Sequence, residues 1–212
     1  RFIKMSKQQR CVVLTENQAI IFGILSRLLQ IANKITIYKQ GALAAEKFFL
    51  SGKRYKRSLY LLLEKLALRL VHDAIFVSNK MADYYKEHFN YKKDYIVINN
   101  KIVLSGKPTL AVDKSDKTEI VYAGSTSKWQ NIDYILQLFK TLDNKTGIQF
   151  KIITTSSYPF EKYEITKLRI ASATPQNIIH ELSVSDIGII IRDDNILNKV
   201  ASPLKIGEYL SA

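Results

Sequence analysis

Near its end, the sequence places a helix start, an ammonium group and a carboxylate close together, in the segment NKVASPLKIGEYLSA. Ser202 is a preferred N-cap residue and Pro203 suits a first helical turn, so we expect a helix to begin here. Free backbone N–H groups at a helix start bind phosphate, and a bound anion would relieve the unfavourable interaction of Lys205 with the helix dipole. Glu208, about one turn further on, could then reach hydroxyl groups attached to that phosphate. The same spacing also fits an ordinary capped helix on the protein surface.

A second candidate for phosphate binding lies at YAGSTSKWQNIDYILQLF. An apolar segment ends in Gly124, which lets the backbone approach a ligand closely, and Ser125 follows it. Lys128 stands at the start of the helical pattern that comes next. No Walker A or Gly-x-Gly-x-x-Gly pattern is present, so this signal is weaker than that of a known phosphate motif.

Both candidates are positioned by an α/β fold. Short runs rich in Val and Ile alternate with segments of helical period, which is typical of strand-helix-strand units around a parallel sheet. We expect strands at 10–15, 34–38, 74–78, 95–99, 119–124, 150–155, 169–173 and 187–191. We expect helices at 17–33, 55–71, 79–89, 129–143, 160–168, 175–183 and 203–211. Open sheets of this class bind ligands at the carboxyl ends of their strands.

Residues 101–117 interrupt this alternation and read as a linker, with Gly106, Pro108 and no sustained apolar period. The sequence therefore predicts two Rossmann-like domains with parallel sheets, one over 1–100 and one over 118–212. We expect both domains to be incomplete.

The positive charge of the chain belongs to its first half. The formal net charge is +13, and 19 Lys and Arg face 7 Asp and Glu as far as Gly106, against 13 and 12 after it. This asymmetry favours an anionic partner, either a phospholipid surface, at about 1 kcal/mol per well-placed cation, or nucleic acid. The excess is mostly Lys and no recognised nucleic-acid motif occurs, so we expect no nucleic-acid partner.

A basic cluster precedes a leucine-rich helical segment. Lys53, Arg54, Lys56 and Arg57 are candidates for contact with an acceptor or a membrane, or form a solvated helix start. The stripe that follows is expected to face the core. It consists of Leu59, Leu62, Leu63, Leu66 and Leu70.

Other kinds of site find little support in the sequence. Cys11 is the single cysteine and lies in an apolar run, so we expect a buried residue rather than a reactive thiol. His, Cys and acidic residues do not occur at ligand spacing, which predicts that the protein has no metal site. No apolar run is long enough for a membrane-spanning helix.

Three segments of the second half resemble the C-terminal half of family-four glycosyltransferases of the GT-B type, which have two Rossmann-like domains. The segments are VYAGSTSKWQNIDYILQLF, HELSVSDIGIIIRDD and NKVASPLKIGEYLSA. Upstream, YKQGALAAEKF, DAIFVSNKMADYYKEHF and YIVINNKI are similar to the later part of the N-terminal acceptor domain. The likeness is greatest to members that assemble bacterial polysaccharides, and it implies a fragment that is truncated at both ends and need not be active by itself.

The resemblance implies retaining transfer of a sugar from a nucleotide diphosphate sugar, without a metal or another cofactor. Lys205 and Lys128 match the basic residues that neutralise the diphosphate, and Glu208 matches the glutamate that holds ribose hydroxyls. The acceptor would be a saccharide or a lipid-linked saccharide, handled by a cytoplasmic enzyme that is peripheral on the inner face of the cell membrane. A nucleic-acid-binding module and a nucleotide-sugar epimerase are the alternative functions.

One departure from the family pattern concerns its first acidic residue. Many members have a second glutamate eight positions before the one matched by Glu208, where this sequence has Val200. Its role could pass to Asp193, Asp194 or Asn195, although these residues could equally form a solvated turn.

Overall fold

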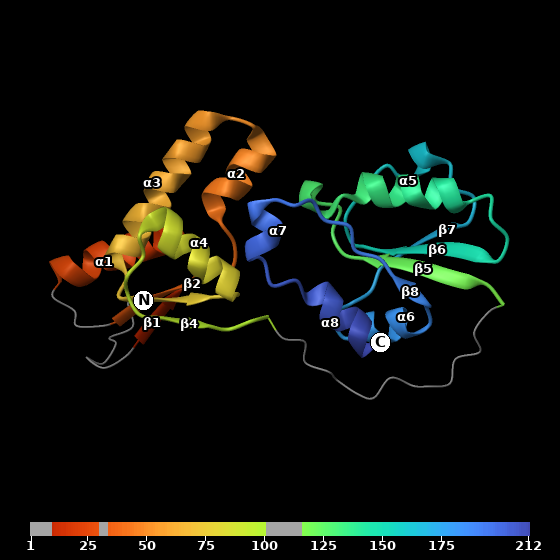
Figure 1. Ribbon diagram of the computed structural model, residues 1–212. Helices are drawn as coiled ribbons and strands as arrows, with labels where there is room; N and C mark the ends of the chain where they lie inside the picture. The colour runs from red at the N-terminus through yellow and green to blue at the C-terminus, as the bar shows by residue number, and fades with distance from the viewer. Residues whose placement is uncertain (1–9, 30–33, 101–115) are drawn as a thin grey trace. The chain divides into compact units, whose positions relative to one another are not determined.

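The structure is a computed structural model that describes residues 10–29, 34–100 and 116–212 (Figure 1). The chain forms two compact units. Unit 1 comprises the described residues of 1–100 together with Asp194–Ser202, and unit 2 comprises those of 101–193 together with Pro203–Ala212. Most of the predicted linker, residues 101–115, lies outside the described residues.

Unit 1 is a parallel four-stranded sheet with the strand order β1-β2-β3-β4. The strands are β1 (Arg10–Val13), β2 (Lys34–Lys39), β3 (Asp73–Phe76) and β4 (Tyr95–Val97). The helices are α1 (Glu16–Leu28), α2 (Leu43–Ser51), α3 (Arg54–Leu70), α4 (Asn79–Phe89) and α7 (Ile196–Val200). Helices α1 to α4 lie on one side of the sheet in Figure 1. Alternate strand residues such as Ile37 and Phe76 are fully buried against Ala67 and Met81 of these helices.

Unit 2 is a second parallel sheet with the order β7-β6-β5-β8. The strands are β5 (Thr118–Ala123), β6 (Ile148–Ile153), β7 (Leu168–Ala171) and β8 (Ile187–Gly188). The helical elements are η1 (Lys128–Gln130), α5 (Ile132–Leu142), η2 (Phe160–Tyr163), α6 (Ile178–Ser183) and α8 (Leu204–Ser211). In Figure 1, α5 covers one face of this sheet and α6 and α8 lie at the other. Ile120 and Tyr122 of β5 belong to the core that includes α5, whereas Val121 and Ala123 pack on the side of Leu182.

Each predicted strand segment contains a strand, and the predicted α/β fold with two parallel sheets is confirmed. The helix predicted at 160–168 is wrong, because only the 3-10 turn η2 forms there and β7 already begins at Leu168. The helix expected from 129 begins at Ile132, because Asn131 adopts a left-handed conformation with φ 52°. The segment Asp194–Ser202 groups with unit 1, whereas the sequence pattern had placed it in the second domain.

Helix α2 was not predicted, because its own sequence supplies no cap. Ala42 stands at its N-cap position without a side-chain hydrogen bond. The fully buried carboxylate of Glu64, on α3, instead accepts hydrogen bonds from Leu43 N at 3.2 Å and Ala44 N at 3.0 Å. A carboxylate at a helix N-terminus also interacts favourably with the helix dipole.

The prediction that the leucine stripe of α3 faces the core is largely wrong. Leu59, Leu62 and Leu66 are 53%, 63% and 39% exposed, and only Leu70 is buried. The helix turns its other side to the core, where Glu64 caps α2 and also pairs with Lys39 at 2.9 Å. Since a buried carboxylate must keep its partners, it fixes the rotation of the helix and leaves the leucines outside.

Candidate functional site

Lys205 is a buried lysine in the first turn of α8, with 9% of its surface exposed. Its ammonium nitrogen donates hydrogen bonds to the hydroxyl of Tyr122 at 2.7 Å and to Oε1 of Gln130 at 2.8 Å. It also lies 4.1 Å from the centre of the Tyr122 ring. These contacts hold the ammonium at the end of β5, where a ligand of an open α/β sheet is expected.

Gly124 follows β5 directly and makes room for this ammonium. Its φ of +144° lies in the region that residues with a side chain rarely adopt. A Cβ atom at this position would lie 2.3 Å from both Cε and Nζ of Lys205. The structure therefore brings together two of the residues that the sequence singled out separately.

The electrostatics of Lys205 favour an anionic ligand. Burial, and to a smaller extent the nearby charge of Arg192, lower the pKa of Lys205 to about 7, and Glu208 offsets this only in part. Burial also lowers the pKa of Arg192. Among the described residues, Lys205 has no carboxylate at ion-pair distance. A bound anion would stabilise the charged form of the ammonium and raise its pKa.

Glu208 lies one turn beyond Lys205 on α8 and is partly buried. Burial raises the pKa of its carboxyl group, and the charge of Lys205 acts in the opposite direction. Within the part of the chain that the structure describes, no residue donates a hydrogen bond to this carboxylate. It is therefore available to accept hydrogen bonds from a ligand that lies beside Lys205.

Ser125 and Lys128 lie in the segment that follows Gly124. The backbone carbonyl of Ser125 accepts a hydrogen bond from the hydroxyl of Tyr122 at 2.6 Å, which links this loop to the partner of Lys205. The Ser125 and Ser127 hydroxyls are 3.0 Å apart. Lys128 is exposed in η1, two residues before Gln130, which contacts Lys205.

The prediction that Ser202 caps the last helix is wrong. Pro203 occupies the N-cap position of α8, and no side chain of the described residues caps the helix. Ser202 belongs to unit 1, where its hydroxyl accepts a hydrogen bond from Asn100 N at 3.1 Å and its carbonyl accepts one from Asn100 Nδ2 at 2.9 Å. This hydroxyl accepts a hydrogen bond from Asn100 instead. In the part of the chain that the structure describes, the first-turn N–H groups of α8 therefore have no side-chain cap.

The position of the missing family glutamate is part of a core. Val200 is 1% exposed, packs in the core of unit 1, and its carbonyl accepts a hydrogen bond from the hydroxyl of Ser78 at 2.6 Å. The three polar residues that could replace the glutamate all have hydrogen-bond or ion-pair partners within the protein. Asp193 accepts from Asn131 Nδ2 at 2.8 Å, Asp194 pairs with Lys199 at 2.8 Å, and Asn195 caps α7 through Asn198 N.

Sequence reasoning missed three residues around Lys205. Tyr122 is buried in the core, but its hydroxyl also contacts the ammonium. Gln130 was assigned to a regular helix, although it ends η1 with its side chain on Lys205. Arg192 follows β8 at the carboxyl edge of the sheet, and a charged residue at the end of a predicted strand could have identified it.

Unit 1 has a polar cavity of about 410 Å³ at the carboxyl ends of β1 and β2. The residues that line it are Leu14, Thr15, Glu16, Tyr38, Lys39, Gln40, Gly41, Leu43 and Glu46. Glu46 packs against Gly41, where a Cβ atom would lie 2.1 Å from Oε1 of the glutamate. Burial raises the pKa of the Glu46 carboxyl group, while the charge of Lys39 lowers it.

A buried ionic network supports this cavity. Lys39 is 4% exposed and pairs with both Glu16 and Glu64. The hydroxyl of Tyr85 donates to Glu64 at 2.5 Å and to the carbonyl of Gly41 at 3.2 Å. The cavity wall is therefore held by charged groups that satisfy one another.

The basic cluster forms the start of α3. Lys53 is its N-cap residue, and Lys53, Arg54 and Arg57 are exposed, whereas Lys56 is partly buried. The guanidinium of Arg57 lies 5.4 Å from the centre of the Phe48 ring. No metal-binding group of His, Cys and acidic residues occurs within residues 10–29, 34–100 and 116–212. In the same ranges, no helix is long and apolar enough to cross a bilayer.

The sequence matches no protein-family model and no curated protein. Solved structures with a similar fold are glycosyltransferases of the GT-B type. OtsA has a TM-score of 0.62 at 10% identity over 89% of this chain and 53% of its own. The lipopolysaccharide outer core galactosyltransferase WaaB has a TM-score of 0.60 at 10% identity over 95% and 54%. The pneumococcal O-GlcNAc transferase GtfA, in complex with UDP and GlcNAc, has a TM-score of 0.56 at 8% identity over 90% and 37%.

These comparisons confirm the expected GT-B fold of two Rossmann-like units with parallel sheets. The chain spans between about a third and about a half of the length of the structures that it matches. At such low identity, the likeness establishes the fold alone.

Proposed function

We propose that the protein is a glycosyltransferase, whose unit 2 binds the diphosphate of a nucleotide sugar at Lys205. The observation that carries this proposal is the buried ammonium of Lys205, which lies beside Gly124 without a carboxylate partner among the described residues. The first turn of α8 adds backbone N–H groups that no described side chain caps. The role that we assign to Glu208 is to accept hydrogen bonds from the ribose.

The chemistry that we assign to this site is stabilisation of the leaving group. When the bond between the sugar and the diphosphate breaks, negative charge develops on the phosphate oxygen. Lys205 and Arg192, with Lys128 on the adjoining loop, would neutralise that charge. Preorganised cations can supply the stabilisation that a divalent metal supplies elsewhere, and the resemblance to retaining, metal-independent enzymes accords with this arrangement.

We assign the acceptor to unit 1, as a saccharide or a lipid-linked saccharide. The polar cavity beside Glu46 can accept hydrogen bonds from sugar hydroxyls, and the basic cluster Lys53, Arg54, Lys56 and Arg57 can contact lipid phosphates. The wider role that we propose is hexosyl transfer during the assembly of a cell-surface polysaccharide. Such an enzyme would work in the cytoplasm, peripherally on the inner face of the cell membrane.

The experiment that tests the proposed donor is a thermal-shift screen of the protein with UDP, GDP, ADP and CMP. A ligand that binds only the folded state raises the melting temperature, by an amount that grows with concentration. We expect a nucleoside diphosphate to raise it and CMP, with one phosphate, to raise it less. If no diphosphate shifted the melting temperature at millimolar concentration, the donor assignment would be wrong.

Binding of UDP should weaken as the pH rises above 7. Lys205 has a pKa of about 7 in the free protein, and a bound diphosphate raises this pKa, so binding takes up a proton. The affinity should then fall by up to about tenfold per pH unit between pH 7 and 9. The terminal phosphate of UDP does not reverse this sign, because a terminal phosphate group with a second pKa of about 6 is already ionised in that range.

Titration calorimetry at pH 7, 8 and 9 measures this dependence, and buffers with different ionisation enthalpies measure the proton uptake. The Lys205→Met variant should bind UDP weakly and without the same pH dependence. A wild-type affinity that stayed constant over the range would remove the Lys205 ammonium from the binding site.

A further inference from the structure

The outer side of α3 carries an apolar stripe that no described residue covers. Tyr55, Leu59, Leu62 and Leu66 follow one another at spacings of four, three and four residues, so they lie on one face of the helix. Tyr55, Leu59 and Leu62 are each more than half exposed. Adjacent solvent-exposed side chains of this size mark a surface that binds something apolar.

The neighbouring helix α1 also exposes apolar side chains. It packs against α3 at Gly23, where a Cβ atom would lie 2.7 Å from Cβ of Leu70. Its residues Ile21, Ile24 and Leu28, spaced by three and four, are 55%, 44% and 73% exposed. Two adjacent helices thus present apolar side chains to the surroundings.

Cations border the stripe along α3. Arg54, Lys65 and Arg69 are exposed and are spaced by eleven and four residues, which places them on one line beside the leucines. Long basic side chains can lay their methylene groups on an apolar surface and keep their charge in water. This combination of an apolar face and a basic border is typical of helices that lie in the plane of a membrane interface.

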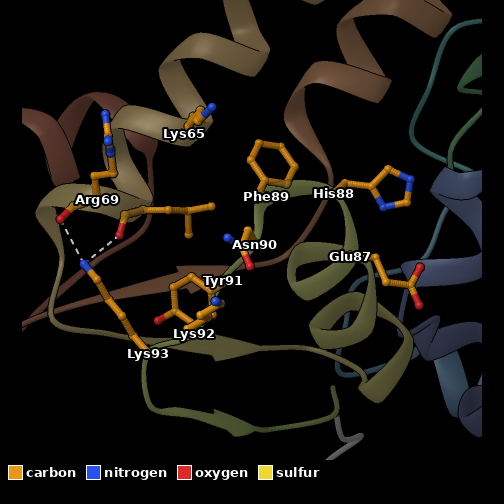
Figure 2. Close-up of a pocket in the computed structure, with 10 residues that line it drawn as sticks. Lys65, Arg69, Glu87, His88, Phe89, Asn90, Tyr91, Lys92 and Lys93 are labelled. Carbon is orange, nitrogen blue, oxygen red and sulfur yellow. Dashed lines mark hydrogen bonds between the residues drawn. The ribbon is translucent and has the colours of Figure 1, made fainter.

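At the C-terminal end of α3, the basic border continues into a cavity of about 370 Å³ (Figure 2). Lys65 and Arg69 line it from α3, and Asn90, Lys92 and Lys93 line it from the chain after α4. Glu87 is the acidic residue of the lining, and in Figure 2 its side chain points away from Lys65 and Arg69. The cavity lies at the amino ends of β3 and β4, at the edge of the sheet opposite the polar cavity beside Glu46.

Lys93 occupies the carbonyl groups at the C-terminal end of α3, which could otherwise attract a cation to this cavity. Its ammonium donates hydrogen bonds to the carbonyls of Leu68 and Arg69, both at 2.9 Å (Figure 2), and also to the carbonyl of Val71. The free carbonyls at the end of α3, which carry the negative end of the helix dipole, are thereby satisfied. Lys65, Arg69 and Lys92 then leave the cavity with an excess of positive charge.

We propose that this face of unit 1 docks on an anionic phospholipid bilayer. The leucines of α3 enter the boundary between headgroups and acyl chains, the bordering cations contact lipid phosphates, and the cavity at Lys65 and Arg69 holds one phosphodiester headgroup. Charge complementarity selects this occupant, because the negative headgroups of an acidic bilayer match the basic border. The acyl chains of the same bilayer match the leucines. This inference rests on the membrane association proposed above and is independent of the donor chemistry in unit 2.

The test is co-sedimentation of the protein with vesicles of phosphatidylcholine that contain roughly one third phosphatidylglycerol. We expect binding that falls with added salt and that is absent with pure phosphatidylcholine. The double variant Leu59→Gln, Leu62→Gln should bind at least about tenfold more weakly, because it removes two exposed apolar anchors. The double variant Lys65→Gln, Arg69→Gln should also lose at least about tenfold.

Matched controls distinguish binding through this surface from non-specific adsorption to vesicles. Tyr134→Gln removes an exposed aromatic of similar exposure on α5, and Lys80→Gln removes an exposed cation on α4. Both controls should bind vesicles as the wild type does, and all variants should keep the wild-type thermal shift with UDP. Unchanged vesicle binding by the leucine variant would overturn the proposal. So would a leucine variant that altered the oligomeric state in light scattering while its vesicle binding stayed the same.

Discussion

Replacing Lys205 by methionine should weaken UDP binding strongly and leave the fold intact or more stable. Hydrogen bonds to a charged group contribute about 1.5–3 kcal/mol, which corresponds to a loss of about 10- to 150-fold in affinity. Methionine keeps much of the length of the side chain but needs no hydrogen-bond partners. Because burial and Arg192 both disfavour the charged lysine, the folded protein loses little when the charge is removed.

Two measurements on the same samples distinguish a binding role from a structural one. Titration calorimetry gives the affinity for UDP, and differential scanning fluorimetry gives the melting temperature without ligand. The exposed Lys145, changed to methionine, serves as the control and should alter neither quantity. If Lys205→Met lowered the melting temperature by several degrees, the lysine would support the fold, and if UDP affinity were unchanged, it would not contact the diphosphate.

The sequence predicted the sheets better than the helices, for a physical reason. A strand such as Ile120–Ala123 is a continuous apolar run because a parallel sheet is buried on both faces, and such a run can be recognised without tertiary information. Helix α2 could not be predicted from its own sequence, because its N-terminal N–H groups donate to Glu64, which is distant in sequence. A helix whose cap comes from another element carries no local start signal.

The rotation of α3 was unpredictable for the same reason. Its leucine period indicates an apolar face but not which way that face turns. The side that became buried contains Glu64, whose partners Lys39 and Tyr85 come from β2 and α4. A pattern in a single sequence predicts that a glutamate is exposed, and here contacts with residues distant in sequence reverse that expectation.

At the candidate site, the sequence identified the residue types but not how they meet. Gly124 and Lys205 were chosen as parts of two separate phosphate cradles, and the structure shows one site in which the lysine side chain lies at the glycine. Ser202 was chosen because serine is a preferred N-cap residue, yet its hydroxyl and its carbonyl both accept hydrogen bonds from Asn100. Propensity describes what a residue can do, and tertiary contacts decide which of the options is used.

Replacing Gly124 by alanine should disrupt the same site by a steric route. The substitution adds a Cβ atom at 2.3 Å from Lys205 Nζ and forces a side chain onto a backbone with φ of +144°. Backbone strain of this kind costs about 1–3 kcal/mol, and the lysine must also leave its contacts with Tyr122 and Gln130. We expect a lower melting temperature together with a loss of at least about tenfold in UDP affinity.

Gly147 provides the matched control for the backbone component. Its φ is +74°, and a Cβ atom there would meet no atom within 4 Å, so Gly147→Ala introduces strain without a clash. Gly147→Ala should lower the melting temperature and leave UDP affinity unchanged. A Gly124→Ala variant that behaved in the same way would show that the close approach of Lys205 does not matter for binding.

A double-mutant cycle isolates the steric component. In the background of Lys205→Ala, the two lysine atoms that would clash with the new Cβ are absent, so Gly124→Ala should there destabilise the protein less than it does in the wild type. The difference between the two costs measures the coupling of Gly124 and Lys205, which thermal or urea denaturation can determine. Because this coupling depends only on contacts within unit 2, it tests the geometry of the site separately from the identity of the sugar donor.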